Sequence, residues 1–305
     1  MVGEIQLAYL IDQIVPEPKK YHPVSSYGKF STYLEELFYS DSKISGGLFA
    51  LANIELVAFL ALLLKKYRIF GLVAVTAISL SGKMLEDEAL EIYRSLKAGN
   101  IDRAKKRLPS LVGRDVDSLD ERGIVRATVE SIAENTVDAV ASTLVLGSVF
   151  GVFGVLLHRV FNTLDAMVGK KNSRYLNFGM ACARIDDLLN YVPSRVSSVI
   201  VLGFSKSPVK NLKLARQQAL LHPSPNAGII EASFALALNI ELGGELSYQN
   251  IREVRPIVGT GGEVRADDIL RATNLKRKVE YVLLVLTLAL SLVVRKLKSI
   301  KREIK

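Results

Sequence analysis

Apolar residues gather in a few long runs that are separated by charged segments. The longest run covers residues 44–64, which is long enough for a helix to cross the hydrocarbon core of a bilayer. Asn53 and Glu55 lie near its middle. Because a charge that faces lipid is costly, we expect Glu55 to face protein or water, in a helix that packs inside a bundle.

Three further runs are shorter or less regular. Residues 69–81 are short for a span unless the helix extends through Leu85, and residues 137–157 combine Gly, Ala, Ser and Val, which suits close helix packing in a membrane. Residues 281–294 precede a tail from Arg295 to Lys305 with six basic residues and one acidic residue. This pattern predicts a C-terminal membrane helix at about 279–297 with a cytoplasmic tail.

The number of spans stays open. Residues 82–136 and 158–195 are rich in Lys and Arg and both favour the cytoplasm, so a full span between them at 137–157 would place one of them outside. Either residues 137–157 are re-entrant or buried, or another run does not cross. We therefore predict an all-α, polytopic integral membrane protein of the cell membrane, with cytoplasmic motif-bearing segments.

The polar segments also have helical patterns. The sequence from Leu85 to Arg94 favours a helix, Gly99-Asn100 supplies a stop, and Pro109 ends the next basic helix. We find no internal repeat, low-complexity tract or long linker. The chain, residues 1–305, is therefore predicted to form a single helical bundle.

Composition excludes several classes of protein. Hydrophobic residues make up 49% of the chain, and the net charge of +9 comes from basic residues that lie beside apolar runs rather than in an aromatic-interleaved stripe, so we expect a lipid bilayer and no nucleic acid as partner. Cys182 is the only cysteine, which excludes disulfide frameworks and predicts a packing role. His158 borders an apolar run and is expected to reach toward the membrane interface.

Two groups of charged residues lie before the 137–157 run. Val112-Gly113-Arg114-Asp115 is a glycine turn that presents a cation and a carboxylate, for which a surface ion pair is a sufficient explanation. Glu130, Glu134 and Asp138 are four residues apart and form an acidic stripe on a helix, with Asn135 beside it. Oxygen ligands of this kind suit Mg²⁺.

A third group follows the run. Asn162 and Asp165 share a helix face, and Gly169 then releases the chain into a cluster of cations. Acid and amide groups followed by flexible cations could hold a metal and the phosphates that it bridges. The cations are Lys170, Lys171 and Arg174.

Two more groups complete the set. Arg184, Asp186, Asp187 and Asn190 are spaced for one or two helix faces, and in outline they are similar to the magnesium–diphosphate sites of prenyl-transferring enzymes. His222-Pro-Ser-Pro-Asn226 is a loop stiffened by two prolines, which suits substrate positioning or proton transfer. No G-x-x-x-x-G-K-[ST] phosphate loop is present.

In this order, the motifs HPV near the start, VGRD, VESIAENTVD, NTLDAMVGKKNSRY, RIDDLLNYVPSR and HPSPNAG resemble the adenosylcobinamide-phosphate synthases of cobalamin biosynthesis. The resemblance runs from about Asp12 to about Asn274 and includes Leu242-Gly243-Gly244. Members of that family usually open with a fuller apolar segment ending in a GDP-like tripeptide, where this chain has Pro16-Glu17-Pro18. The first membrane helix is therefore expected to be short or absent.

The resemblance implies an integral membrane ligase that uses ATP and Mg²⁺. It joins 1-amino-2-propanol or its O-phosphate to a propionate of the corrinoid adenosylcobyric acid, and it could associate with other enzymes of the cobalamin pathway. We assign catalytic roles to Glu134, Asp165, Asp186 and His222. We assign metal binding to Glu130, Asp138 and Asp187. We assign substrate or phosphate binding to Arg114, Asn135, Asn162, Lys170, Lys171, Arg174, Arg184 and Asn226.

Two alternatives remain from other classes. A magnesium-dependent membrane prenyl- or phospho-transferase would use the aspartates for a diphosphate, would act on isoprenoids and would need no ATP. A transporter or assembly subunit would use intramembrane acids as a pathway, but it leaves the VGRD and HPSPNAG motifs without a role.

Overall fold

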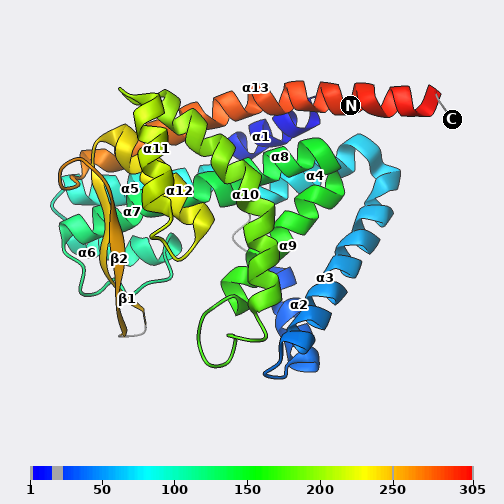
Figure 1. Ribbon diagram of the computed structural model, residues 1–305, viewed down its shortest axis with the longest axis horizontal. Coiled ribbons are helices and arrows are strands. Elements are labelled where there is room, and N and C mark those ends of the chain that lie inside the picture. Colours follow the sequence, from blue (N-terminus) through cyan, green and yellow to red (C-terminus); the bar gives the residue numbers. More distant parts are fainter. Residues whose placement is uncertain (1–2, 16–22, 249–250, 304–305) are drawn as a thin grey trace. The chain divides into compact units, whose positions relative to one another are not determined.

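The computed structural model describes residues 3–15, 23–248 and 251–303, and in this part of the chain the protein is mostly helical (Figure 1). His22 and the Pro16-Glu17-Pro18 departure lie outside the described residues. Contacts group the chain into two compact units. Unit 1 comprises Met1–Ser81, Asp138–Asn190 and Leu283–Lys305, and unit 2 comprises Gly82–Val137 and Tyr191–Val282. The single domain of the sequence analysis stays a prediction.

In the residues that the structure describes, the regular elements of unit 1 are all helices. Its elements are α1 (Glu4–Ile14), α2 (Pro23–Phe38), α3 (Lys43–Leu64), η1 (Lys65–Tyr67), α4 (Arg68–Ser79), most of the π-helical segment η3 (Thr136–Ala141), α8 (Ser142–Phe150), α9 (Val152–Val168), the first part of α10 (Met180–Gly203) and the end of α13 (Asp267–Glu303). The first helix, α1, has 11 residues and is too short to span a bilayer.

The core of unit 1 joins α3, α9 and α10. Phe49 and Phe178 pack with ring centroids 5.1 Å apart, and Cys182 is buried beside them, which confirms its packing role. Gly46 permits this approach, since a Cβ atom there would lie 1.9 Å from the carbonyl oxygen of Phe178. The small residue on α3 therefore sets how closely the chain after α9 packs against it.

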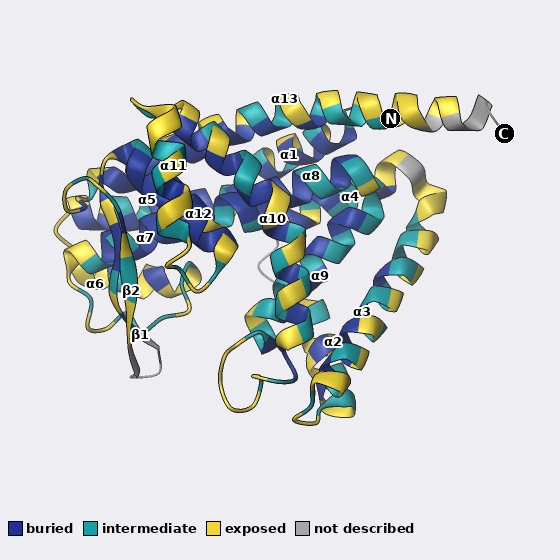
Figure 2. Cartoon of the chain, in the orientation of Figure 1, coloured by how far each residue is buried: buried dark blue, intermediate teal, exposed yellow. Residues whose placement is uncertain are grey.

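Helix α3 matches the predicted 44–64 run and has the character of a membrane span. Segment Lys43–Tyr67 is long and apolar enough to cross a bilayer by length and composition, and only 22% of its apolar window is buried. Figure 2 shows α3 largely in the colours of intermediate and exposed residues. Asn53 is buried and its side-chain oxygen accepts a 2.7 Å hydrogen bond from the Tyr27 hydroxyl, whereas Glu55 is exposed. The protein therefore buries the amide rather than the charge.

A second segment, Ile69–Lys97, meets the same criterion, as the extended reading of the 69–81 run allowed. Leu80 nevertheless has an extended backbone (φ −75°, ψ 149°) and divides the segment into α4 and α5 (Gly82–Lys97). Within the described residues these are the two candidate spans. The predicted C-terminal membrane helix lies inside the 37-residue helix α13, which is not one of them.

The 137–157 run does not form one straight helix. It begins in the π-helical segment η3 and continues as the nine-residue helix α8, and then Gly151, with φ +66°, turns the chain into α9. Helices α8 and α9 pack against each other. The run is therefore two helices joined at a glycine with positive φ, and both alternatives given for it, re-entrant or buried, stay predictions.

Unit 2 contains the remaining helices and a β-hairpin. Its elements are α5, α6 (Ile101–Arg107), η2 (Leu108–Ser110), α7 (Glu121–Asn135), the second part of α10, α11 (Pro208–Ala219), α12 (Pro225–Leu238), β1 (Glu241–Tyr248), β2 (Ile251–Gly259) and the first part of α13. Helix α12 is almost wholly buried and contacts α7, α11 and both strands.

The hairpin corrects the all-α prediction. Strands β1 and β2 pair antiparallel, with an irregularity between Leu242 and Gly244. Gly243 and Gly244 both have left-handed backbones, with φ near +90°. A Cβ atom on Gly243 would lie 2.2 Å from the carbonyl oxygen of Pro256 on the facing strand. The glycine pair that marks a family motif is therefore a bulge that only glycine allows.

Candidate active site: two clusters of carboxylates

Two sequence motifs of unit 2 meet in a buried ion pair. The Arg114 guanidinium of the VGRD turn lies 2.6 Å from the Glu130 carboxylate on α7, and their side chains are 7% and 2% exposed. Such a pair is stable only where both charges are satisfied, because each charge has lost its water. Arg114 is therefore fixed in the interior of unit 2, and the surface ion pair expected for this turn is wrong.

The second oxygen of Glu130 binds the β-hairpin. The backbone N–H of Gly243 donates to it at 2.8 Å, and Arg126, one turn before Glu130 on α7, donates to the Gly243 carbonyl at 2.6 Å. The bulge thus turns one backbone N–H toward α7. Glu130 links the VGRD turn, helix α7 and the glycine bulge.

A glutamate and a histidine lie close together beside this ion pair. The side chains of His222 and Glu231, from the loop before α12 and from α12 itself, are both buried, and Nε2 of His222 lies 3.7 Å from a Glu231 oxygen. Burial raises the pKa of Glu231 well above its ordinary value, and the charges of Glu130 and Glu134 raise it further. Burial lowers the pKa of His222, so that the ring is neutral at pH 7.

The loop holds His222 by its other ring nitrogen. Nδ1 lies 3.0 Å from the Ser224 carbonyl oxygen and 3.1 Å from the Ser224 backbone nitrogen. When Nδ1 donates to the carbonyl, Nε2 carries a lone pair and can accept a proton. The rigid HPSPNAG loop therefore presents one ring nitrogen on the side of Glu231.

Glu134 differs from the other carboxylates of the group because its side chain is exposed. It interacts electrostatically with Glu231, as does Arg255 of strand β2. Asn135 donates to the carbonyl of Ser131 at 3.0 Å on its own helix. We call the group the arginine–carboxylate cluster, and its members are Arg114, Glu130, Glu134, His222, Glu231 and Arg255.

Unit 1 has its own group of acids. Asp186, on α10, is buried, and its Oδ2 atom accepts a 3.0 Å hydrogen bond from the Asn190 amide one turn later. Burial and the neighbouring charge of Asp165 raise the pKa of Asp186 to about 7, and the Asn190 and Asn162 amides act in the opposite direction. The structure therefore brings together side chains from the two helices α9 and α10. We call Asn162, Asp165, Asp186 and Asn190 the aspartate cluster.

A histidine orients the amide of this cluster. Nε2 of His158 lies 3.1 Å from the Asn190 oxygen, which also accepts from the Ser142 hydroxyl at 2.5 Å. Nδ1 lies 3.3 Å from the Thr143 hydroxyl. Since the Asn190 amide nitrogen donates to Asp186, its oxygen must accept, which places the histidine proton on Nε2. His158 is wholly buried, so the prediction that it reaches the interface is wrong.

The predicted cations of the loop after α9 and of α10 differ in whether they form an ion pair. Arg174 pairs with Glu35 of α2 at 2.9 Å and lies 4.2 Å from the ring centre of Tyr39. Lys170, Lys171 and Arg184 are exposed and form no ion pair with another described residue. Two lysines and one arginine thus remain available to an anion.

Asn226 lies at the start of α12 and holds an arginine. Its side-chain oxygen accepts hydrogen bonds from the Ser194 hydroxyl, at 3.1 Å, and from the Arg195 guanidinium. Arg195 in turn stacks on the Tyr191 ring at 3.7 Å. The two ends of the RIDDLLNYVPSR motif therefore belong to separate surroundings, the aspartates to unit 1 and the arginine to unit 2.

The predicted metal ligands belong to two different units. Glu130 lies in unit 2, while Asp138 and Asp187 lie in unit 1. Within the described ranges, no three His, Cys, Asp or Glu side chains are placed to hold a metal ion. Mg²⁺ often needs only one or two carboxylates, with water and substrate phosphates as its other ligands. The aspartate cluster fits that smaller requirement, since Asp186 Oδ1 is buried with no hydrogen-bond partner in the described part of the chain.

The CobD/Cbib protein family model matches residues 5–276. The chain belongs to this family. Among its relatives, the cobalamin biosynthesis protein CobD of Mycobacterium tuberculosis (strain ATCC 25618 / H37Rv) is 36% identical over 90% of this chain and 91% of its own. The protein of the same name from Halalkalibacterium halodurans is 37% identical over 83% and 85%, and that from Chromobacterium violaceum 34% identical over 95% and 96%. No solved structure matches the chain.

The sequence analysis of this CobD/Cbib chain missed three charged residues that interact with the predicted site residues. Glu231 is the single acid in the apolar stretch from Ala227 to Leu238, and a lone charge in such a stretch is a signal that could have found it. Glu35 and Arg255 lie in ordinary amphipathic surroundings and carry no such signal. Only the packing of their elements reveals them.

Proposed function

We propose that the protein acts in cobalamin biosynthesis as an ATP-dependent ligase. It joins 1-amino-2-propanol or its O-phosphate to a propionate of adenosylcobyric acid through an amide bond and gives adenosylcobinamide or its phosphate. Membership of the CobD/Cbib family and the printed names of the relatives support the pathway. The reaction itself rests on the motif resemblance and on the chemistry of the two clusters.

The arginine–carboxylate cluster carries the proposal. Four of its six members come from three motifs that are far apart in the sequence, and the ion pair between Arg114 and Glu130 fixes a cation in the interior. A buried glutamate with a raised pKa beside a neutral histidine is an arrangement suited to proton transfer near pH 7.

The reaction has two demands. A propionate does not react with an amine until one carboxylate oxygen becomes a leaving group, and phosphoryl transfer from ATP converts it into an acyl phosphate. The amine nitrogen then forms a bond to the acyl carbon, the bond to the phosphate oxygen breaks, and phosphate leaves. The amine nitrogen must lose a proton in this step. We assign its acceptance to Nε2 of His222, with Glu231 beside it and exposed Glu134 as the carboxylate that meets a ligand.

The residues of the aspartate cluster fit Mg²⁺. Asp165 and Asp186 would hold the ion with the side-chain oxygen of Asn162, because a buried carboxylate such as Asp186, whose pKa is raised by burial and by the charge of Asp165, favours a cation as neighbour. When bound, Mg²⁺ neutralises charge on phosphoryl oxygens. Lys170 and Lys171, which are exposed, would contact the same phosphates. Asn190 and His158 orient Asp186 through the hydrogen bonds described above.

The location of the enzyme is part of the proposal. We place it in the cell membrane as a multi-pass protein, with the motif-bearing segments and the C-terminal tail in the cytoplasm, where ATP is found. The apolar and largely unburied helix α3 supports membrane association. At this membrane location the protein could associate with other enzymes of the cobalamin pathway.

A second candidate is a magnesium-dependent prenyl- or phospho-transferase. The paired aspartates of unit 1 favour it, since two acids with adjacent lysines also suit a diphosphate. It requires no ATP, and it gives the His222–Glu231 pair no proton to accept from an amine.

A mass-spectrometric assay on the detergent-extracted full chain tests the proposal. The reaction contains adenosylcobyric acid, ATP and Mg²⁺, with aminopropanol and its phosphate offered separately. We expect a product heavier by one amide condensation that disappears when ATP is withheld. Turnover without ATP on an isoprenoid diphosphate would favour the transferase instead.

His222→Gln makes the assay specific for the site. We expect this variant to lose at least about a hundredfold in kcat, because general-base assistance contributes about 10²- to 10⁴-fold. His158→Gln in unit 1 is the comparison among histidines, and its effect should depend on Mg²⁺ concentration. Unchanged turnover in His222→Gln would remove the histidine from the mechanism and leave the ligase assignment to stand on the product alone.

A further inference from the structure

Helix α11 of unit 2 has one packed face and one face in water. The helix contacts α12 and β2, with Ala215 wholly buried and the Gln218 side chain bonded to the backbone of Gly259 at the end of β2. On the outer face, Val209 and Leu220 are each 86% exposed, more than any other large hydrophobic residue that the structure describes. The fold therefore leaves an apolar side chain in water at each end of this helix.

The outer face carries cations between these two apolar residues. One stripe of the helix, at intervals of four, three and four residues, consists of Val209, Lys213, Arg216 and Leu220. These intervals place the four side chains on the same side of an α-helix. Lys210 lies beside the stripe and is also exposed. The outer face is thus amphipathic, and its polar groups are basic.

This stretch of the chain supplies no negative charge to balance the cations. No acidic residue occurs between Asp187 and Glu231 in the sequence. Elsewhere in unit 2, exposed cations have acidic partners, as in the pair Arg107–Glu88. Four exposed cations of the α11 region form no ion pair with another described residue, namely Lys206, Lys210, Lys213 and Arg216. A partner of negative charge is therefore the electrostatic complement of this face.

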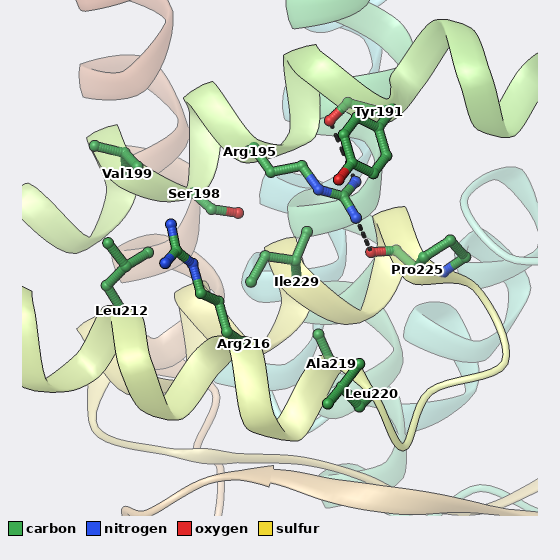
Figure 3. Close-up of a pocket in the computed structure, with 10 residues that line it drawn as sticks. All are labelled: Tyr191, Arg195, Ser198, Val199, Leu212, Arg216, Ala219, Leu220, Pro225 and Ile229. Atoms are coloured by element: carbon green, nitrogen blue, oxygen red, sulfur yellow. Dashed lines mark hydrogen bonds between the residues drawn. The ribbon is translucent and has the colours of Figure 1, made fainter.

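The exposed face continues onto the second part of α10. A cavity of about 350 Å³ is lined by Arg216 and Leu220 of α11 together with Tyr191 and Val199 of α10 (Figure 3). Tyr191 and Val199 are exposed as well. Tyrosine, with an apolar ring and a polar hydroxyl, is enriched at the boundary between membrane and water. We call this surface the α10–α11 face, and its members are Tyr191, Val209, Lys210, Lys213, Arg216 and Leu220.

The chemistry of the α10–α11 face favours a lipid surface over a protein as partner. Its exposed apolar residues stand apart with lysines between them, whereas the core of a protein interface is depleted in lysine. At a lipid surface, apolar side chains enter the boundary between headgroups and acyl chains, and lysine stems let their charges reach the phosphates. Helix α11 has 12 residues and is too short to span a bilayer, so it would lie along the surface.

We propose that the α10–α11 face lies on the anionic lipid surface of the membrane. Val209 and Leu220 insert at the level of the headgroups, and the cations between them contact the lipid phosphates. Because α11 packs on α12, which carries Glu231, this contact holds the arginine–carboxylate cluster of unit 2 at the lipid surface. The inference rests on the membrane location given under the proposed function and adds a dependence on lipid charge. It does not rest on the ligase reaction.

A fluorescent probe on Leu220→Cys reads the contact directly. The native Cys182 is buried and is the only other cysteine, so an environment-sensitive thiol probe attaches at position 220. The labelled full chain is reconstituted in phosphatidylcholine nanodiscs with increasing fractions of phosphatidylglycerol. We expect the emission to shift to shorter wavelength as that fraction rises. High salt should reverse the shift, because it screens exposed charges.

Two charge variants of the labelled chain test the role of the lysines. A lysine near an anionic surface contributes about fivefold to binding, so Lys210→Gln/Lys213→Gln should reduce the ratio of docked to undocked helix at least about tenfold. Lys106→Gln/Arg122→Gln is the matched control, because it removes the same charge from exposed positions on α6 and α7 and should leave the shift unchanged. A probe on Val254→Cys, an exposed apolar position of β2, should not respond to phosphatidylglycerol.

Three results would overturn the proposal. The first is the absence of a shift at position 220 in every nanodisc, and the second is an equal shift with and without phosphatidylglycerol. The third is a shift that needs no lipid and grows with protein concentration, which would assign the face to a second copy of the chain. No corrinoid, amine or ATP is present. A chain that shows the lipid-dependent shift but makes no product therefore supports the surface and contradicts only the reaction.

Discussion

The two carboxylate clusters solve the same electrostatic problem in different ways. In the arginine–carboxylate cluster, an arginine and a backbone N–H satisfy the two oxygens of Glu130. In the aspartate cluster, Asp186 receives an amide hydrogen bond on one oxygen, and burial together with its acidic neighbours raises its pKa. The first cluster carries its own counter-charge, whereas the second favours a cation from outside the chain. A buried acid whose partner is an amide therefore indicates a cationic ligand more strongly than a buried acid that already pairs with an arginine.

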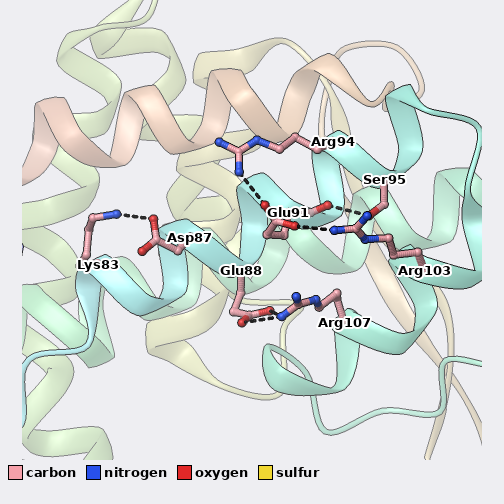
Figure 4. A network of polar contacts seen from close by, with 8 residues as sticks. All are labelled: Lys83, Asp87, Glu88, Glu91, Arg94, Ser95, Arg103 and Arg107. Carbon is pink, nitrogen blue, oxygen red and sulfur yellow. Dashed lines mark hydrogen bonds and ion pairs between the residues drawn. The ribbon is translucent and has the colours of Figure 1, made fainter. Parts of the chain in front are cut away.

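The exposed ion pairs of unit 2 differ from both clusters, because their charges remain in contact with water. Helices α5 and α6 are joined by pairs such as Arg107–Glu88 and Arg103–Glu91, at 3.2 and 3.1 Å (Figure 4). Water competes for these charges, so each pair contributes little to stability. Distance alone therefore does not rank ion pairs, and burial decides.

The largest effect is expected from removing the built-in cation. Arg114→Ala leaves Glu130 buried without its counter-charge and should lower the free energy of unfolding by about 3–5 kcal/mol. Arg122→Ala is the matched control, because the Arg122–Glu263 pair has the same 2.6 Å separation but is 59% and 68% exposed. Its loss should cost at most about 1 kcal/mol. Denaturant unfolding of both variants in detergent measures the difference, and equal losses would contradict the contrast that we draw between buried and exposed pairs.

A smaller effect is expected from adding a cation. Mg²⁺ at a hundred times its Kd should stabilise the wild type by about 2.7 kcal/mol through binding to the aspartate cluster, and this gain should disappear in Asp186→Asn. Glu130→Gln, in the other cluster, should keep the gain although the variant starts less stable. Thermal unfolding with and without Mg²⁺ measures both.

Asp187→Asn resolves the remaining ligand in the same experiment. If this variant loses the Mg²⁺ response, Asp187 belongs to the site as the sequence predicted. A full response together with full turnover would remove it from the ligand set.

The smallest effect concerns pH. The pKa of Glu231 is raised in the folded protein, so between its ordinary value of 4.5 and the raised value the folded state holds a proton that the unfolded state has released. The contribution of Glu231 to the free energy of unfolding is therefore greatest at low pH, and it falls as pH rises through that window. Glu231→Gln removes this loss, so its stability relative to the wild type should increase from pH 5 to pH 8. A flat difference between the two melting curves over this range would contradict the raised pKa.

The sequence located those features that depend on neighbours along the chain. The 44–64 run became α3 with nearly the same bounds, and the four-residue spacing of Asp186 and Asn190 became a hydrogen bond, because both follow from helix periodicity. The hairpin was missed because its strands contain glycines and charges instead of a clear alternation. The turn at Gly151 was missed because a single glycine inside an apolar run gives no sign of its φ.

The sequence itself determined the family, through the order of its motifs, and it supplied most of the candidate residues. Only the tertiary structure decided which residues act together. It paired Arg114 of the VGRD turn with Glu130 of α7, brought Glu231 to His222, and placed Asp186 beside Asp165. The physical reason is that burial and long-range partners set the charge state of a carboxylate, and neither can be obtained from its neighbours in the sequence.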